Sequence, residues 1–163
     1  MSGDEGDDEP DSHAELPIDP DAGARPMHWQ ASAVLLVFCG GVLGTALRYT
    51  AETLVPHDGS SWPWATFTVN LVGAFVLGVL LEGLARAGDD TGWRRRARLF
   101  AGTGFCGAFT TYSAFALEIS VLGKGSHFVT AVGYGLASVV GGVIVAWLGI
   151  VLAAGVRRRR AHS

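Results

Sequence analysis

Long apolar stretches separated by short polar segments run through most of this chain. A helix needs about 20 mostly apolar residues to cross a bilayer. Four stretches meet that length, at residues 30–53, 64–84, 98–122 and 127–154. Charged residues are few inside them, and Asn70 is an isolated amide in the second. The pattern predicts an all-α integral membrane protein, with one membrane domain of four transmembrane helices over residues 29–155.

The third stretch contains a segment rich in glycine and hydroxyl groups, Gly102-Thr-Gly-Phe-Cys-Gly-Ala-Phe-Thr-Thr-Tyr-Ser-Ala-Phe115. Glycine and β-branched threonine weaken a helix. Irregular backbone at membrane depth is tolerated only where it is buried in protein or lines a polar cavity, and its freed carbonyls can hold ions. We therefore expect the third helix to be broken mid-span, around residues 103–111, to build an ion site. A glycine-rich packing seam is the alternative.

The same segment matches the dinucleotide fingerprint, as Gly102-x-Gly104-x-x-Gly107. That motif needs a preceding strand, a following helix and an acidic residue about 20 positions on. Here it lies inside an apolar span, and no second strand is predicted after it, so we do not expect a nucleotide site. Elsewhere, Gly40 and Gly44 have the four-residue spacing of small residues that lets a neighbouring helix approach closely.

Composition supports the membrane class, because 49% of the residues are hydrophobic, 17% are charged and 23 are glycine. The net charge of −3 conceals a segregation of signs. Residues 1–26 carry nine acidic residues against Arg25 alone, whereas the remainder carries eleven Lys and Arg against six Asp and Glu. Residues 1–28 are predicted to be a disordered acidic tail, and residues 156–163 a basic tail.

Positive charges also predict the orientation. Four spans place both termini on one side, and nearly all Lys and Arg of the loops and tails lie there, including Arg86, the run between 94 and 98, and the run 157–160. Lys124 alone lies in the opposite loops. By the positive-inside rule, the protein is a multi-pass cell-membrane protein with cytoplasmic termini. The arginine runs flank apolar spans and are explained as topology determinants, so we expect no nucleic-acid partner.

Three polar side chains within the predicted spans are candidates for function. Asn70 is an amide inside the second span, where it hydrogen-bonds either another helix or a substrate. Arg48 is either a snorkelling interfacial arginine or a cation that draws anions to a pore mouth. Glu118, just after the glycine-rich segment, is explained by an interfacial position.

The fourth span carries Thr130, Tyr134 and Ser138 at four-residue spacing, and hence on one helical face. They either bond a neighbouring helix or form a file of neutral donors. Such donors suit a small hard anion, which must exchange its water for other donors without being trapped by a full charge. Tyr112 and Phe115 share a face and can add positive ring edges.

Three segments carry a family resemblance: Gly40-Gly-Val-Leu-Gly-Thr-Ala-Leu-Arg-Tyr49, Thr66-Phe-Thr-Val-Asn-Leu-Val-Gly-Ala-Phe75 and Gly104-Phe-Cys-Gly-Ala-Phe-Thr-Thr-Tyr-Ser-Ala-Phe115. Together with the weaker Tyr134-x-x-x-Ser138, they resemble the CrcB/Fluc family of small fluoride channels in order and spacing. The resemblance covers about residues 29–155 and leaves out the acidic tail.

The resemblance implies an antiparallel dimer with two narrow pores along its interface. It also implies a structural sodium ion (Na+) at the centre, held by the main-chain carbonyls of Gly107 and Thr110. The implied fluoride pathway comprises Asn70, Tyr112, Ser113, Phe115, Tyr134 and Ser138. The implied vestibule and accessory residues are Arg48, Thr111 and Glu118.

The sequence departs from the family pattern at three positions. Ala108 replaces a usual glycine, Tyr112 a usual phenylalanine, and Ala114 a common threonine. The strong excess of Lys and Arg on the side of the termini is also unusual for the family. A chain that forms an antiparallel homodimer must insert in both orientations, and therefore needs nearly balanced Lys and Arg on its two sides. We therefore expect the partner to be a related, oppositely oriented subunit, otherwise a second copy of this chain.

The resemblance predicts a passive fluoride-specific channel that exports cytoplasmic fluoride and lowers its toxicity, with no enzymatic step. Two alternatives remain at this point. A small four-helix proton-coupled multidrug exporter would need a carboxylate deep in a span, whereas Glu52, Glu82 and Glu118 lie near span ends. A non-transporting membrane assembly subunit would need no broken helix.

Overall fold

The computed structural model describes the backbone of residues 31–160 and the side chains of residues 31–155. The predicted acidic tail, residues 1–28, lies outside this part. The described elements are all helical: α1 (Ala31–Leu54), α2 (Trp64–Ala85), α3 (Gly92–Ala97), η2 (Arg98–Cys106), α4 (Gly107–Phe109), α5 (Tyr112–Lys124) and α6 (Phe128–Arg160). They give four helical stretches long and apolar enough to span a membrane: Ala31–Leu54, Trp64–Ala85, Gly92–Lys124 and Phe128–Gly155.

The third stretch is built from several pieces. The α-helix α3 continues into the π-helix η2 and then into the short α4. Thr110 and Thr111 follow with extended backbone (ψ 154° and 122°), and α5 then begins at Tyr112. Residues 103–109 are therefore helical, and the prediction of non-helical backbone from residue 103 is wrong for them. A π-helix keeps hydrogen bonds inside the segment despite its glycines, as lipid requires.

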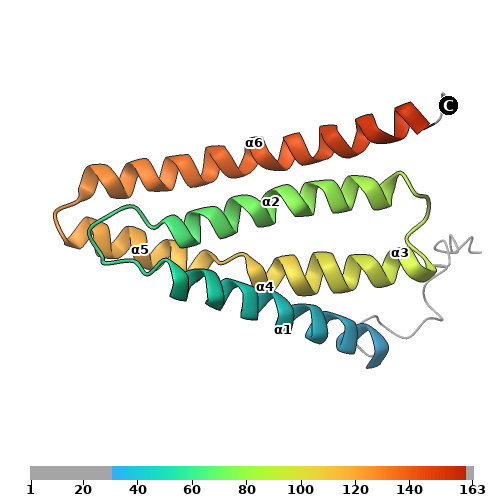
Figure 1. Cartoon of the computed structure of the whole chain (residues 1–163), viewed down its shortest axis with the longest axis horizontal. Coiled ribbons are helices and arrows are strands. Elements are labelled where there is room, and N and C mark those ends of the chain that lie inside the picture. The colour runs from blue at the N-terminus through green and yellow to red at the C-terminus, as the bar shows by residue number, and fades with distance from the viewer. Residues whose placement is uncertain (1–30, 161–163) are drawn as a thin grey trace, which may run out of the picture.

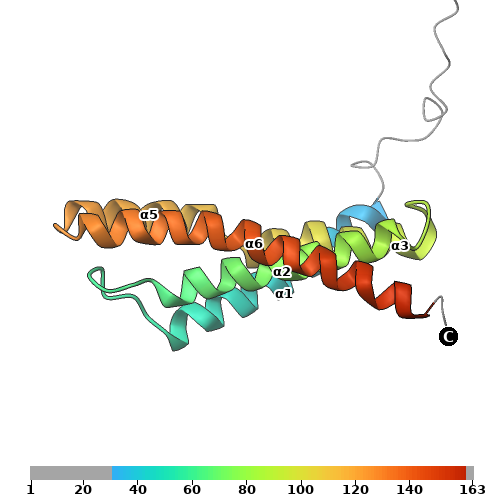
Figure 2. The same ribbon diagram turned by 90° about the horizontal axis from the view of Figure 1, so that it is seen from above.

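The helices run side by side along one axis (Figure 1). The start of α1, the end of α2 and the end of α6 lie at one end, and the loops after α1 and α5 lie at the other. The first part of the third span packs on α1, whereas α5 packs on α6, and α6 also packs along α2. Figure 2 shows α5 and the start of α6 diverging from α1 and α2 at the end opposite the C-terminus.

Glycines set how closely the helices approach. A Cβ atom on Gly40 would lie 2.1 Å from the carbonyl oxygen of Phe100, and one on Gly44 would lie 2.3 Å from that of Phe105. The close approach predicted from this pair is therefore confirmed. Gly78 allows the same contact between α2 and α6, since its Cβ would lie 2.3 Å from the Ala146 oxygen.

Apolar side chains cover much of the outer surface. Phe38 on α1 and Trp147 on α6 are 65% and 60% exposed, respectively. The buried cluster near the α5–α6 connection is small, and comprises Leu122, Ala131 and Tyr134. An apolar exterior of this extent fits a lipid environment.

Candidate functional site

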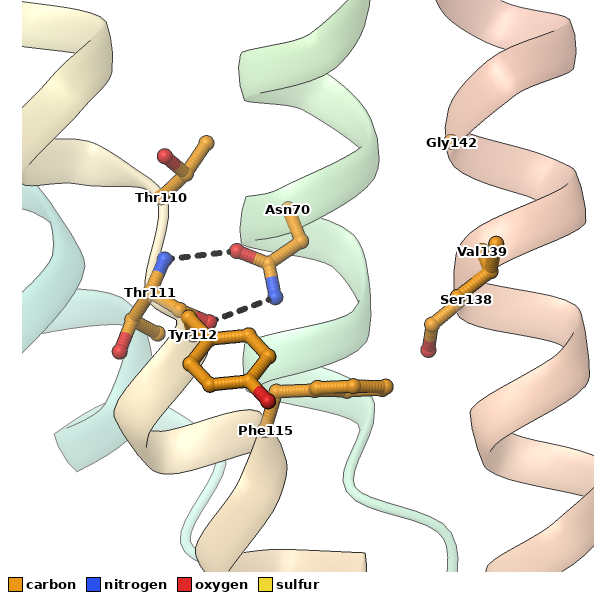
Figure 3. Close-up of a pocket in the computed structure, with 8 residues that line it drawn as sticks. All are labelled: Asn70, Thr110, Thr111, Tyr112, Phe115, Ser138, Val139 and Gly142. Atoms are coloured by element: carbon orange, nitrogen blue, oxygen red, sulfur yellow. Dashed lines mark hydrogen bonds between the residues drawn. The ribbon is translucent and has the colours of Figure 1, made fainter.

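A cavity of about 310 Å³ opens beside the extended residues between α4 and α5 (Figure 3). Its walls come from α2, the extended residues after α4, α5 and α6, and none of the lining side chains that the structure describes is charged. The lining residues are Asn70, Thr110, Thr111, Tyr112, Phe115, Ser138, Val139 and Gly142. The cavity therefore unites an amide, several hydroxyls and two aromatic rings, which are neutral groups that can donate hydrogen bonds or present positive ring edges.

Asn70 joins α2 to the extended segment through two hydrogen bonds (Figure 3). Its Oδ1 accepts from the Thr111 amide at 2.8 Å, and its Nδ2 donates to the Thr111 carbonyl at 3.1 Å. Backbone groups inside a membrane need such partners when they leave a helix. The amide of Asn70 thus bonds a neighbouring segment, as one of the two sequence interpretations had it, and it also lines the cavity.

The hydroxyls of the segment are also engaged. Thr110 Oγ1 donates to the Cys106 carbonyl at 2.9 Å, so it closes the end of α4. Thr111 Oγ1 accepts from the Ala114 amide at 3.2 Å and caps α5, and it lies 3.3 Å from Ser113 Oγ. Ser113 lies outside the set that lines the cavity. Gly73 makes room for Thr110, whose Cγ2 would lie 2.2 Å from a Cβ at that position.

Arg48 contacts the end of α4 from α1. Its Nε donates to the Ala108 carbonyl at 3.2 Å, and its Nη1 forms an ion pair with Glu52 at 3.4 Å. A cation beside the last carbonyls of a helix is favourable, because those oxygens carry partial negative charge. Arg48 lies outside the cavity lining. Its charge is partly compensated by Glu52.

Several carbonyls at the end of α4 lack a hydrogen-bond donor. Between residues 31 and 155, hydrogen bonds end on the Cys106 and Ala108 carbonyls, whereas none ends on those of Gly107, Phe109 or Thr110. Thr111, whose amide would bond Gly107 in a continuous helix, donates to Asn70 instead. Three backbone oxygens, those of Gly107 and Thr110 among them, are thereby left available to an external partner.

Glu118 forms a second polar cluster on α5. Its Oε1 accepts from the Thr66 hydroxyl at 2.6 Å and its Oε2 accepts from the Tyr134 hydroxyl at 2.7 Å. Thr66 is 2% exposed and Tyr134 is fully buried. The carboxylate thus links three helices, and a simple interfacial position does not describe it.

Phe115 lies between the cavity and this cluster. Its ring centroid is 5.3 Å from that of Tyr134 and 6.2 Å from that of Tyr112. Tyr112 is 81% exposed on the protein surface. Ser138 Oγ is buried in the cavity wall and has no hydrogen-bond partner among the described residues, so its hydroxyl is available to a bound species.

Of the residues inferred from the sequence, the structure gathers Asn70, Tyr112, Phe115 and Ser138 at one cavity, and places Tyr134 and Glu118 together beside it. Thr66 was not among the site residues predicted from the sequence. A signal was present, because Thr66 and Asn70 are four residues apart and share a face of α2.

Comparison with known proteins identifies the family. A family model described as "CrcB-like protein, Camphor Resistance (CrcB)" matches residues 35–150. The protein named fluoride-specific ion channel FluC 2 of Leifsonia xyli subsp. xyli is 44% identical over 138 residues, which is 85% of this chain and 94% of that protein. FluC 1 of Cutibacterium acnes is 45% identical over 113 residues, covering 69% of this chain and 79% of the relative.

A third relative, the fluoride-specific ion channel FluC of Mesorhizobium japonicum, is 40% identical over 121 residues, or 74% of this chain and 94% of its own length. The aligned region contains the cavity and the Glu118 cluster, and the four apolar helices suit a multi-pass membrane protein. This chain therefore belongs to the CrcB/FluC family of membrane proteins.

Proposed function

We propose that this chain conducts fluoride passively across the cell membrane and so exports it from the cytoplasm. The observation that carries the proposal is the cavity in which Asn70, Phe115 and Ser138 meet without a charged side chain. Neutral donors and ring edges can replace the water of a small anion without holding it as firmly as a full charge would. The names of the similar proteins support fluoride as the ion.

The driving force comes from the membrane itself. An inside-negative potential expels an anion with about 2.3 kcal/mol per charge per 100 mV. Outward transport then needs no chemical step. Both termini are cytoplasmic in this proposal. Most of the Lys and Arg outside the spans lie at the end of the bundle where α1 begins and α6 ends, and such residues favour the cytoplasmic side.

A structural sodium ion belongs to the same proposal. The carbonyl oxygens of Gly107 and Thr110 accept no hydrogen bond within the described part of the chain, and oxygen suits a hard cation. That part holds no group of three or more His, Cys, Asp or Glu that could bind a metal. Two carbonyls are too few for a complete coordination shell, so the matching pair would come from a second protomer. When bound, the ion would join the two protomers where the helix of each third span is interrupted at Thr110 and Thr111.

The second protomer is proposed to lie in the opposite orientation. The strong bias of Lys and Arg favours one direction of insertion for this chain, so a related subunit with the reverse bias is the expected partner. Co-purification of the two subunits, with no antiparallel dimer formed by this chain alone, would support this. A conducting antiparallel homodimer would contradict it.

Fluoride efflux from liposomes tests the proposed function, with the related subunit added if this chain alone does not assemble. Phe115→Ile removes a ring from the cavity and should lower the efflux rate at least tenfold. Phe128→Ile is the matched control, because Phe128 is 69% exposed and lies outside this cavity, and it should conduct normally. Equal rates in both variants would refute the assigned route.

The two alternatives give different results in the same vesicles. A proton-coupled exporter would move cationic compounds against a proton gradient, and Glu118 would be its carboxylate. An assembly subunit would support neither flux. Cation transport without fluoride efflux would therefore replace the channel proposal.

A further inference from the structure

Aromatic rings connect the cavity with the loop between α1 and α2, at the end of the bundle opposite the C-terminus (Figure 1). Phe115 lines the cavity, and its ring centroid lies 5.3 Å from that of Tyr134. The Tyr134 centroid lies 5.6 Å from that of Trp62 in the loop, and these two rings meet edge to face with 82° between their planes. Neighbouring rings thus lead from the cavity to the loop.

A tight turn holds Trp62 against the helices. Its carbonyl accepts from the Trp64 amide at 2.8 Å, and Pro63 between them has φ −75° and ψ 74°, which makes an inverse γ-turn. Pro63 is fully buried, and proline fixes φ near this value. The Trp62 ring packs edge to face on Phe67, at 5.4 Å between centroids, as well as on Tyr134. The turn and the ring contacts together fix the position of the indole.

The indole N–H of Trp62 lacks an acceptor. Its Nε1 is buried and has no hydrogen-bond partner among the described residues. Glu118, the carboxylate beside Tyr134, accepts from the Thr66 and Tyr134 hydroxyls within this part of the chain. Trp64, by contrast, is 59% exposed, as is usual for a tryptophan at a membrane interface. A buried donor without an acceptor is costly, so a ligand that accepts its hydrogen bond would be stabilised here.

We propose that Trp62 Nε1–H donates a hydrogen bond to fluoride at the loop end of its route and helps to select this ion. The inference rests on the proposed function. Fluoride is a small anion and a strong acceptor, and a neutral N–H stabilises it without the firm hold of a full positive charge. Ser138 Oγ is a second buried donor without a partner among the described residues, and it lies at the cavity. Between these two donors, the ring edges of Tyr134 and Phe115 carry partial positive charge.

The indole N–H signals in the NMR spectrum of the isotope-labelled full chain in detergent test the contact, with the related subunit added if this chain alone does not assemble. Sodium fluoride should move the Trp62 signal downfield until the site is saturated, because hydrogen bonding deshields the proton. Sodium chloride at the same ionic strength should leave the signal in place. Trp93 and Trp147, which are 65% and 60% exposed, are internal controls and should respond to neither salt. Loss of the signal in Trp62→Phe assigns it.

Fluoride efflux from liposomes gives a second readout. Trp62→Phe keeps a ring beside Tyr134 but removes the N–H, and it should lower the efflux rate about fivefold. Trp147→Phe is the matched control, since it removes an N–H from an exposed position on α6 and should conduct normally. Benzothienylalanine at position 62 guards against misfolding of Trp62→Phe. It has the shape of tryptophan with sulfur in place of the N–H, and should reproduce the loss.

The outcomes separate this inference from the proposed function. A Trp62 signal that fluoride does not move, or that chloride moves equally, would overturn the inference even if the wild type conducts fluoride. Efflux at the wild-type rate in both position-62 variants would also overturn it. If the wild type released no fluoride, the channel proposal would fail, whereas a fluoride-specific shift of the Trp62 signal would still show the binding site.

Discussion

The two parts of the third span pack by different means. Before Thr110, η2 and α4 lie against α1, and the contact is backbone to backbone because Gly40 and Gly44 carry no side chain. After Thr111, α5 lies against α6, and the contact is made by side chains such as Phe115 and Glu118. The first part is therefore stabilised by close packing of backbone against backbone, and the second largely by contacts of polar and aromatic side chains.

This difference locates the candidate site. The third span packs on α1 before Thr110 and on α6 after Thr111. The neighbouring helix is thus exchanged at these two residues, and the cavity opens at this exchange point. Asn70 from α2 bonds both backbone groups of Thr111, and Arg48 from α1 bonds the Ala108 carbonyl just before it. A change of helix partner thus exposes backbone and donors at membrane depth, where an uninterrupted helix would conceal them.

Gly40→Ala should have the largest effect, because it attacks the backbone contact directly. The new Cβ would lie 2.1 Å from the Phe100 oxygen, and backbone atoms cannot yield as a flexible side chain can. We expect a loss of about 3 kcal/mol or more in the free energy of unfolding, measured from thermal unfolding in detergent. Gly41→Ala is the control, since its Cβ would meet only the Ala108 Cβ at 3.9 Å. Equal destabilisation by both would contradict the packing described here.

Asn70→Ala should follow, since it removes both partners of Thr111 at the exchange point. Two backbone groups would be left unbonded, and we expect a loss of about 2–3 kcal/mol, together with slower fluoride efflux. Thr68→Ala alters an exposed polar residue of the same helix and should leave stability unchanged. If Asn70→Ala unfolds at the wild-type temperature, the two hydrogen bonds do not stabilise the exchange.

Tyr134→Phe tests the side-chain packing of the second part. It removes the donor to Glu118 Oε2, and we expect a loss of about 1–1.5 kcal/mol. Tyr112→Phe removes a hydroxyl from a residue that is 81% exposed and should cost little. A double-mutant cycle with Thr66→Val measures the coupling, because both hydroxyls bond the same carboxylate. Strict additivity would mean that the cluster does not act as a unit.

The smallest effect is expected at the start of the first part. The Arg98 guanidinium, hydrogen-bonded to Asp90 at 2.9 Å, lowers the pKa of that carboxyl. Since the folded pKa lies below the unfolded value of about 3.9, the stabilisation is present above about pH 4 and is lost as the pH falls through the folded pKa. Asp90→Asn should therefore flatten the acid side of a plot of unfolding temperature against pH. A curve parallel to that of the wild type would exclude this contribution.

Much of the architecture follows from local patterns, because apolar length predicts the spans and small residues at four-residue spacing predict the approach of α1. That Asn70, Phe115 and Ser138 lie together was implied by the family resemblance and not by a local pattern, and the three residues line one cavity. The hydrogen bonds of Arg48 to Ala108 and of Asn70 to Thr111 join residues 60 and 41 positions apart, and only the tertiary arrangement reveals them. The glycine-rich residues suggested a longer loss of helix, yet most of them are retained in η2 because π-type hydrogen bonds accommodate them.

Selective efflux tests the central claim most directly, namely that the donors at the exchange point form a route for fluoride. Liposomes containing the protein, with its partner subunit if one is required, would be loaded with both fluoride and chloride, and a potassium ionophore would set the potential. Fluoride should leave within minutes while chloride is retained. Release of both ions at similar rates, or retention of both, would contradict it.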